Sequence, residues 1–225
     1  MFKTTVIISA LNPPKSLIDL VKSLKTGGFK KIITVNDGSS KESQEIFDAI
    51  AGLGGTVLKH PINRGQGAAI KTGMAYVLQN HLEATGVIMA DADGQHTAKD
   101  IIKIAKLQQE DPEAIILGVR QINFFKIPIR NFIGNFAAKI FFRLLTGKNI
   151  ADTQCGLRAV PTSLIPNLLS LNGQKYEYMT QMLLQLTKSG ATIIQVPIET
   201  IYALHIHSHF RPVRDSFSII RMFFK

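Results

Sequence analysis

The stretch TGVIMADADGQHTA, residues 85–98, decides how the first half of this chain folds. Its opening residues form a short apolar run with β-branched side chains, which predicts a buried strand over 85–90. A polar turn occupies 91–95, and a helix is expected to begin near Ala98. A strand that passes through a polar loop into a helix is the repeating unit of α/β folds.

The same unit recurs on both sides of this stretch, where apolar spacing predicts further strands and two amphipathic helices. The strands are 4–10, 30–36, 56–60 and 113–119, and the helices are 16–25 and 66–79. This alternation predicts an α/β fold with a largely parallel, doubly wound sheet. The length of 225 residues, without an internal repeat or linker, predicts one domain, 1–225.

The composition limits the classes of partner. Lys and Arg number 26 against 16 Asp and Glu, which gives a net charge of +10 at pH 7. Such an excess attracts polyanions: phosphate-rich ligands, nucleic acid or anionic lipid. The single Cys155 excludes an internal disulfide, and no signal peptide is recognised, so a cytoplasmic setting is expected. No apolar run approaches the roughly 20 residues that a spanning helix needs.

Three polar loops follow predicted strands, at 36–40, 63–67 and 91–95. In open parallel sheets, ligands bind at the carboxyl ends of the strands. Because these ends meet at one edge of the sheet, we expect the three loops to form a single site.

The third loop carries two acidic side chains that alternation points the same way, Asp91 and Asp93, and Gln95 can add a third oxygen. Hard oxygen ligands of this kind suit Mg²⁺ or Mn²⁺. The same pattern would also arise without a metal if the acidic residues capped the helix near Ala98.

The other two loops leave two interpretations each. The glycines of 63–67 would let backbone N–H groups approach an anion, or would simply form a tight turn. This loop lacks a P-loop ending, and Ile70 stands where the third glycine of a dinucleotide fingerprint belongs, which disfavours both of those classes. Asp37 could accept hydrogen bonds from a ribose or a base, or could serve the turn itself.

The segment 114–151 contains no acidic residue, while Lys and Arg accumulate in it. Apolar residues recur there at helical spacing, edged by Lys139 and Arg143. They are Phe132, Ile133, Phe136, Ala137, Ile140, Phe141, Leu144 and Leu145. The pattern predicts a basic amphipathic region at about 120–148 that faces a membrane, the alternative being an ordinary helix packed on the sheet.

Seven segments, spread over nearly the whole chain, resemble those of the inverting family 2 glycosyltransferases, specifically the dolichyl-phosphate mannosyltransferase and undecaprenyl-phosphate glycosyltransferase branch. They are VNDGSS (35–40), NRGQGAAIKTG (63–73), MADADGQH (89–96), GVR (118–120), DTQCGLRA (152–159), YEY (176–178) and the pair VPIETIY (196–202) and SHFRPVRDS (208–216). Seven matches in family order make the resemblance specific for the branch, though not for the sugar.

The resemblance implies a single-domain nucleotide-diphospho-sugar transferase fold of the GT-A type, with a mostly parallel central sheet flanked by helices. It implies transfer of one sugar, with inversion, from a UDP-hexose or UDP-N-acetylhexosamine to undecaprenyl or another polyprenyl phosphate, for cell-wall or polysaccharide glycosylation. The expected place is the cytoplasmic face of a membrane. Relatives often carry later transmembrane helices, so a missing C-terminal membrane portion is considered, and a homo-oligomer is left open. Nucleic acid is not expected as a partner.

The resemblance also implies a set of site residues. The catalytic residues would be Asp91, Asp93, Arg130 and Arg158, and the ligands of Mg²⁺ or Mn²⁺ would be Asp91, Asp93 and Gln95. The substrate-binding residues would be Asn12, Asp37, Asn63, Arg64, Gly65, Ala92, Arg120, Glu177, His209 and Arg211. Arginine forks suit phosphate oxygens, and a phosphate monoester is already anionic at neutral pH, so the acceptor needs no general base.

Some features keep two interpretations or depart from the family. Glu177 could orient the sugar or cap a helix. The first strand ends in 9–13, Ser-Ala-Leu-Asn-Pro, where members usually read Pro-Ala-Tyr-Asn-Glu, and Asn36 replaces an Asp, which leaves the nucleotide base open.

Two other classes of protein remain as alternatives. A sugar nucleotidyltransferase would need a glycine-rich, arginine-containing loop after its first strand, and 9–14 offers none. A non-catalytic relative would bind anionic lipid or nucleic acid through charge alone.

Overall fold

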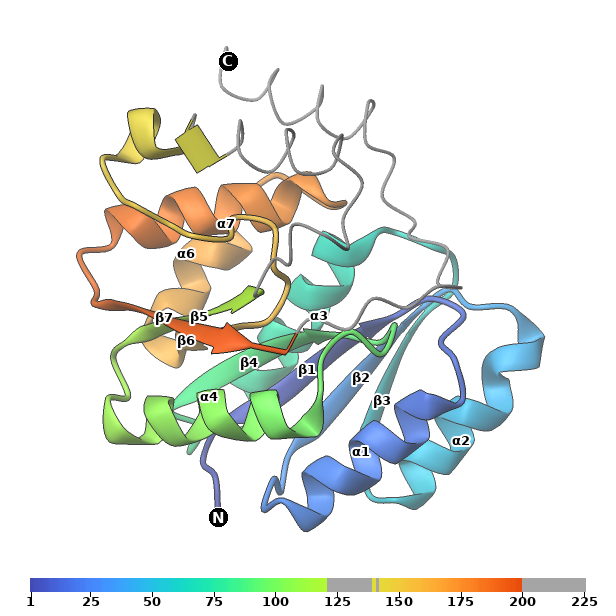
Figure 1. Ribbon diagram of the computed structural model, residues 1–225. Coiled ribbons are helices and arrows are strands. Elements are labelled where there is room, and N and C mark those ends of the chain that lie inside the picture. The colour runs from blue at the N-terminus through green and yellow to red at the C-terminus, as the bar shows by residue number, and fades with distance from the viewer. Residues whose placement is uncertain (121–138, 141, 200–225) are drawn as a thin grey trace, which may run out of the picture.

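The computed structural model describes residues 1–120, 139–140 and 142–199. At its centre lies one seven-stranded sheet in the order β3-β2-β1-β4-β6-β5-β7 (Figure 1). The strands are β1 (Thr5–Ala10), β2 (Ile32–Asp37), β3 (Thr56–His60), β4 (Gly86–Asp91), β5 (Ile115–Arg120), β6 (Arg158–Pro161) and β7 (Ile193–Ile198). The helices are α1 (Ser16–Thr26), α2 (Gln44–Gly52), α3 (Gln66–Asn80), α4 (Ala98–Glu110), α6 (Ile165–Leu169) and α7 (Glu177–Lys188), with 3₁₀ turns η1 (Lys41–Ser43) and η2 (Thr162–Leu164).

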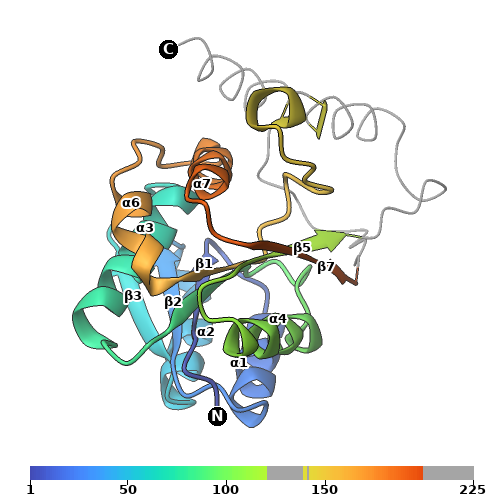
Figure 2. The same cartoon turned by 90° about the vertical axis from the view of Figure 1, so that its left-hand side faces the viewer.

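Helices cover both faces of this sheet, as Figure 2 shows with α3, α6 and α7 on one side and α1, α2 and α4 on the other. Each face buries its own apolar cluster. In α1, Leu17, Val21 and Leu24 recur every three or four residues and are at most 1% exposed, so this helix packs one stripe onto the sheet. Strands such as β2, buried on both faces, explain the continuous apolar runs in the sequence.

The predicted α/β fold with a mostly parallel sheet is confirmed. β1 pairs in parallel with β2 and β4, β2 with β3, and β5 with β7. β6 is the exception, because it runs antiparallel between β4 and β5. The sequence did not predict β6, which has only four residues, or β7.

The reversed direction of β6 matters for the site. Met89, near the end of β4, is paired with Arg158, the first residue of β6. The loop that precedes β6 therefore lies at the sheet edge where β4 ends. That edge also carries the three polar loops of the first half of the chain.

Most of the predicted amphipathic region lies outside the described residues. In its described part, residues 142–146 are helical and Phe142 is buried. Ile140, Leu144 and Leu145 are 45%, 79% and 49% exposed, which is unusual for large apolar side chains. No helix within the described part of the chain has the length and apolarity that crossing a membrane requires.

Candidate active site

The loops at the ends of β2 and β3 are joined through Asp37. Its Oδ1 accepts a hydrogen bond from the backbone N–H of Arg64 at 2.9 Å, and its Oδ2 accepts one from that of Gly65 at 2.8 Å. Gly38, with φ +73°, packs so closely that a Cβ there would lie 2.3 Å from the backbone nitrogen of Asn63. Two of the three loops that were predicted to converge are therefore in contact.

The carboxylate of Asp37 is held from a third direction by a residue that the sequence analysis missed. His60, the last residue of β3, donates from Nδ1 to Oδ1 of Asp37 at 2.6 Å, and its Nε2 lies 2.9 Å from Oγ1 of Thr72. Asp37 is only 4% exposed. Its described contacts support the turn interpretation, since they fix the backbone of 63–67, and contact with a nucleotide stays a prediction.

The loop after β1 is tied to the same group. Asn12, with a positive φ of 48°, accepts a hydrogen bond at Oδ1 from the backbone N–H of Ser40 at 2.8 Å. Its own backbone N–H donates to Oγ of Ser39 at 2.9 Å. Asn36, where the family more often has Asp, accepts from the N–H of Ser39 at Oδ1. Asn12 therefore joins the loop after β1 to the loop after β2 through these two hydrogen bonds.

The acidic loop after β4 is not a helix cap. Thr97 caps α4, because its Oγ1 accepts the N–H of Asp100 at 3.1 Å. Asp93 instead accepts two bonds from Gln95, one from the backbone nitrogen at 3.0 Å and one from Nε2 at 2.8 Å. The capping interpretation of Asp91 and Asp93 is therefore wrong. Both residues lie at the carboxyl end of β4, where the polar loops meet.

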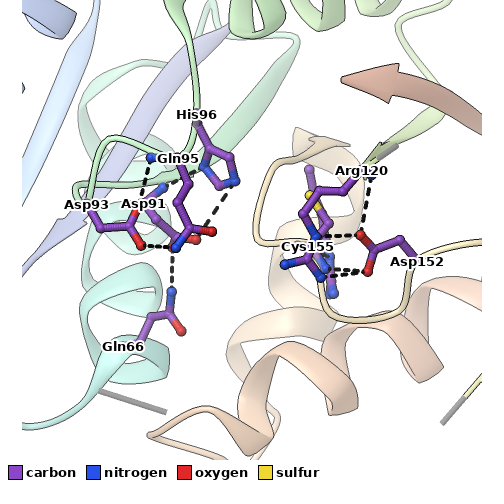
Figure 3. A network of polar contacts seen from close by, with 9 residues as sticks. Gln66, Asp91, Asp93, Gln95, His96, Arg120, Asp152 and Cys155 are labelled. Carbon is purple, nitrogen blue, oxygen red and sulfur yellow. Dashed lines mark hydrogen bonds and ion pairs between the residues drawn. The ribbon is translucent and has the colours of Figure 1, made fainter. Parts of the chain in front are cut away.

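This pair of carboxylates suits a divalent cation. Burial, and then the neighbouring charge of Asp91, raise the pKa of Asp93 above its usual value, so a positive charge between the two acids would be favourable. Since Nε2 of Gln95 faces Asp93, its amide oxygen points away from that carboxylate (Figure 3). Across the described residues, no group of three His, Cys, Asp or Glu side chains could hold a metal. The two carboxylates fit an ion such as Mg²⁺, which commonly keeps waters and binds substrate phosphates, whereas Gln95 could add its oxygen only if its amide turned over.

Asp91 is surrounded by side chains and backbone from three other segments. Nε2 of Gln66, the first residue of α3, donates to its Oδ1 at 2.6 Å. Its backbone N–H donates to Nδ1 of His96 at 3.0 Å. Gly156 lies so close that a Cβ would be 2.4 Å from Oδ2. Neither Gln66 nor Gly156 was predicted as a site residue, although both fall inside the segments that resemble the family.

A second polar group lies opposite, in the loop before β6 (Figure 3). Asp152 pairs with Arg120 through two contacts, Nε to Oδ2 at 2.7 Å and Nη2 to Oδ1 at 3.0 Å. Its Oδ1 also accepts the N–H groups of Gln154 and Cys155. Burial raises the pKa of Asp152, but the hydrogen bond and charge of Arg120 outweigh burial, and the pKa lies below its usual value. Arg120, at the end of β5, is thereby held in place.

Arg158 does not reach the open edge of the site. It is 1% exposed, and its guanidinium donates to the carbonyl oxygens of Cys155 and Thr153, both at 3.0 Å, and of Met179. Contact with a substrate phosphate, expected from sequence, is not what this placement favours. Arg158 instead joins the loop before β6 to α7.

The remaining predicted residues fall into three groups. Asn63 and Arg64 are exposed, Gly65 is partly exposed and Ala92 is buried. Glu177, the first residue of α7, accepts the N–H groups of Gln174 and Lys175 at Oε1, both at 3.1 Å, so it binds the loop before the helix and not an N–H group of the helix itself. The last group, Arg130, His209 and Arg211, lies outside the described residues.

Comparison with known proteins defines the class. The pattern of Glycosyl transferase family 2 matches residues 5–161, which is more than half of the chain. The chain therefore belongs to this family and is a glycosyltransferase, as the resemblance predicted. This membership decides against the nucleotidyltransferase alternative.

Two relatives by sequence and one solved structure of the same fold are similar to this chain. The chain is 30% identical over 215 residues to the UDP-N-acetylglucosamine--dolichyl-phosphate N-acetylglucosaminyltransferase of Methanococcus voltae, covering 88% of this chain and 85% of that protein. It is 30% identical over 182 residues to the undecaprenyl-phosphate 4-deoxy-4-formamido-L-arabinose transferase of Edwardsiella ictaluri, covering 75% and 53%. Glucosyl-3-phosphoglycerate synthase of Mycobacterium tuberculosis, solved with Mn²⁺, UDP and phosphoglyceric acid, shares the fold with a TM-score of 0.70 at 14% identity, covering 98% and 75%.

Proposed function

We propose that this glycosyltransferase moves one sugar from a nucleoside diphosphate sugar to a polyprenyl phosphate. The observation that carries the proposal is the meeting of the Asp91 and Asp93 carboxylates with the glycine loop 63–67 at one sheet edge. Such an edge can hold a diphosphate between backbone N–H groups and a cation. The acceptor class is supported by relatives whose names specify dolichyl or undecaprenyl phosphate.

Asp91 and Asp93 would hold the divalent cation, Mg²⁺ or Mn²⁺, and Gln95 would join them once its amide turns its oxygen toward the ion. A bound cation would offset the negative charge that builds on the departing nucleoside diphosphate. The two carboxylates are near one another and partly shielded from water before any cation is bound. A cation would therefore bind without the cost of bringing them together.

The donor would be a UDP-hexose or a UDP-N-acetylhexosamine. Support comes from the relative of Methanococcus voltae, whose name specifies UDP-N-acetylglucosamine, and from the neighbour of the same fold that was solved with UDP and Mn²⁺. Asn63, Arg64 and Gly65 would line the donor, because Asp37 holds their backbone at the edge that carries Asp91. Asn12 would order the neighbouring loop.

The acceptor phosphate would attack the sugar from the face opposite the leaving group, which inverts the anomeric centre. A phosphate monoester carries its charge at neutral pH, so positioning and charge neutralisation carry the step, with no general base. Arg120 would contribute positive charge on the acceptor side, where Asp152 fixes its orientation. Arg130, His209 and Arg211 are proposed for the same role from the resemblance alone.

Binding at the cytoplasmic face of a membrane would bring the enzyme to a lipid acceptor. The exposed Ile140, Leu144 and Leu145, beside Lys139 and Arg143, suit an anionic lipid surface. Apolar side chains would enter the interface while the basic side chains meet lipid phosphates.

The test is transfer of radiolabel from a panel of UDP- and GDP-sugars into organic-extractable lipid, with undecaprenyl phosphate in detergent. Wild type is compared with Asp93→Asn and with Asp19→Asn, a control at an exposed helical position. We expect transfer from a UDP-sugar with Mn²⁺, abolished by EDTA, reduced at least 10²-fold in Asp93→Asn and unchanged in Asp19→Asn. Full activity of Asp93→Asn, or transfer that survives EDTA, would refute the assigned role of the carboxylates.

A further inference from the structure

Gln66 connects the glycine loop 63–67 with the acidic loop 91–95. It is the first residue of α3 and follows Gly65, whose backbone N–H is bonded to Asp37. The same carboxylate is held by His60, so the start of α3 is fixed relative to the end of β2. From this fixed point the side chain of Gln66 extends to the end of β4, where Nε2 lies 2.6 Å from Oδ1 of Asp91.

In this contact Gln66 is the donor and Asp91 is the acceptor. An ionised carboxylate only accepts hydrogen bonds, so the amide nitrogen of Gln66 must face Asp91. A hydrogen bond to an ionised group is about twice as strong as one between neutral groups. The glutamine donor carries no charge of its own, so it orients Asp91 without neutralising the charge that a cation would use.

We propose that Gln66 is a positioning residue, which fixes the carboxylate of Asp91 for binding a divalent cation together with the donor diphosphate. This inference rests on the function proposed above. It assigns a role in that site to a residue at the junction of the glycine loop and α3.

The geometry around Asp91 leaves the carboxylate little freedom. Oδ1 is held by Gln66, and Oδ2 is packed against the backbone of Gly156, where a Cβ would be only 2.4 Å away. The backbone N–H of Asp91 donates to Nδ1 of His96, which limits movement of the main chain at Asp91. Oδ1 still has a second lone pair for a cation, and partners of this kind orient metal ligands in proteins.

The test measures Mn²⁺ affinity directly, from the electron paramagnetic resonance signal of free Mn²⁺ titrated with protein, with and without UDP. Gln66→Met keeps the length and helical preference of the side chain but removes the donor. Gln66→Asn keeps the amide but is one methylene too short. Gln109→Met makes the same chemical change at an exposed position of α4 and serves as the control.

We expect the Kd for Mn²⁺ to rise about 10–100-fold in both Gln66 variants and to stay at the wild-type value in Gln109→Met. Circular dichroism and thermal melting establish that each variant is folded. Wild-type Mn²⁺ affinity in a folded Gln66→Met or Gln66→Asn would overturn the inference and leave the proposed function standing. A wild-type protein that binds no Mn²⁺ would overturn the cation site and the inference together. Mn²⁺ binding without sugar transfer to any lipid would count against the proposed function alone.

Discussion

Replacing Gly156 with Ala should disable the site while leaving the fold intact. The backbone of Gly156 is not in the left-handed region, so alanine meets no conformational penalty there. Its Cβ would, however, lie 2.4 Å from Oδ2 and 3.0 Å from Cγ of Asp91, whereas ordinary contacts begin near 3.4 Å. The carboxylate must therefore move by about 1 Å, and a misplacement of that size costs about 10²-fold in rate.

The assay compares kcat, the Mn²⁺ concentration for half-maximal activity, and the melting temperature. Gly52→Ala is the matched control, because a Cβ at Gly52 in α2 would meet no atom within 4 Å. We expect Gly52→Ala to keep wild-type activity, and Gly156→Ala to lose about 10²-fold while melting within a few degrees of wild type. A Gly156→Ala enzyme with wild-type activity and Mn²⁺ dependence would refute the reasoning that Gly156 sets the position of Asp91.

Further predictions concern the loop before β6. Burial raises the pKa of the Cys155 thiol to about 12, so iodoacetamide should leave it unmodified at pH 8 in the folded protein and alkylate it in urea. Asp152→Asn should lower the free energy of unfolding by about 1–3 kcal/mol at pH 7. Since Arg120 holds the pKa of Asp152 below its usual value, that stability is present above about pH 4 and is lost as pH falls through the lowered pKa, so urea titrations of wild type and variant should converge in acid. Arg158→Met should cost about 2–3 kcal/mol in the same measurement, because three buried carbonyl contacts are lost; a loss of transfer activity without a loss of stability would contradict this.

The strands of the first half of the chain could be predicted because local pattern decides them. The run 56–60 coincides with β3, and 4–10 begins one residue before β1, whose β-branched residues are buried on both faces and leave a continuous apolar signal. β6 could not be found in this way. It has four residues and begins with Arg158, and its place between β4 and β5 depends on contacts far away in sequence.

The residues of the candidate site also differ in whether local sequence could predict them. Asp91, Asp93 and Gln95 could be grouped because a single strand and its turn bring them together. Gln66 and Gly156 reach Asp91 because α3 packs on β1 and β2 and because β6 pairs with β4, which no local spacing encodes. Arg158 was assigned to phosphate from the family resemblance and because arginine forks suit phosphate oxygens, yet three carbonyl groups from two segments of the chain satisfy its guanidinium.

The most direct test of sugar transfer to a polyprenyl phosphate is mass spectrometry of the lipid after incubation of the wild-type protein with UDP-sugar, undecaprenyl phosphate and Mn²⁺. The account predicts a new species heavier than the acceptor by one hexose or N-acetylhexosamine residue, which is absent when EDTA replaces Mn²⁺. Unmodified lipid with every donor, from a protein that is folded and binds Mn²⁺ with UDP, would contradict it.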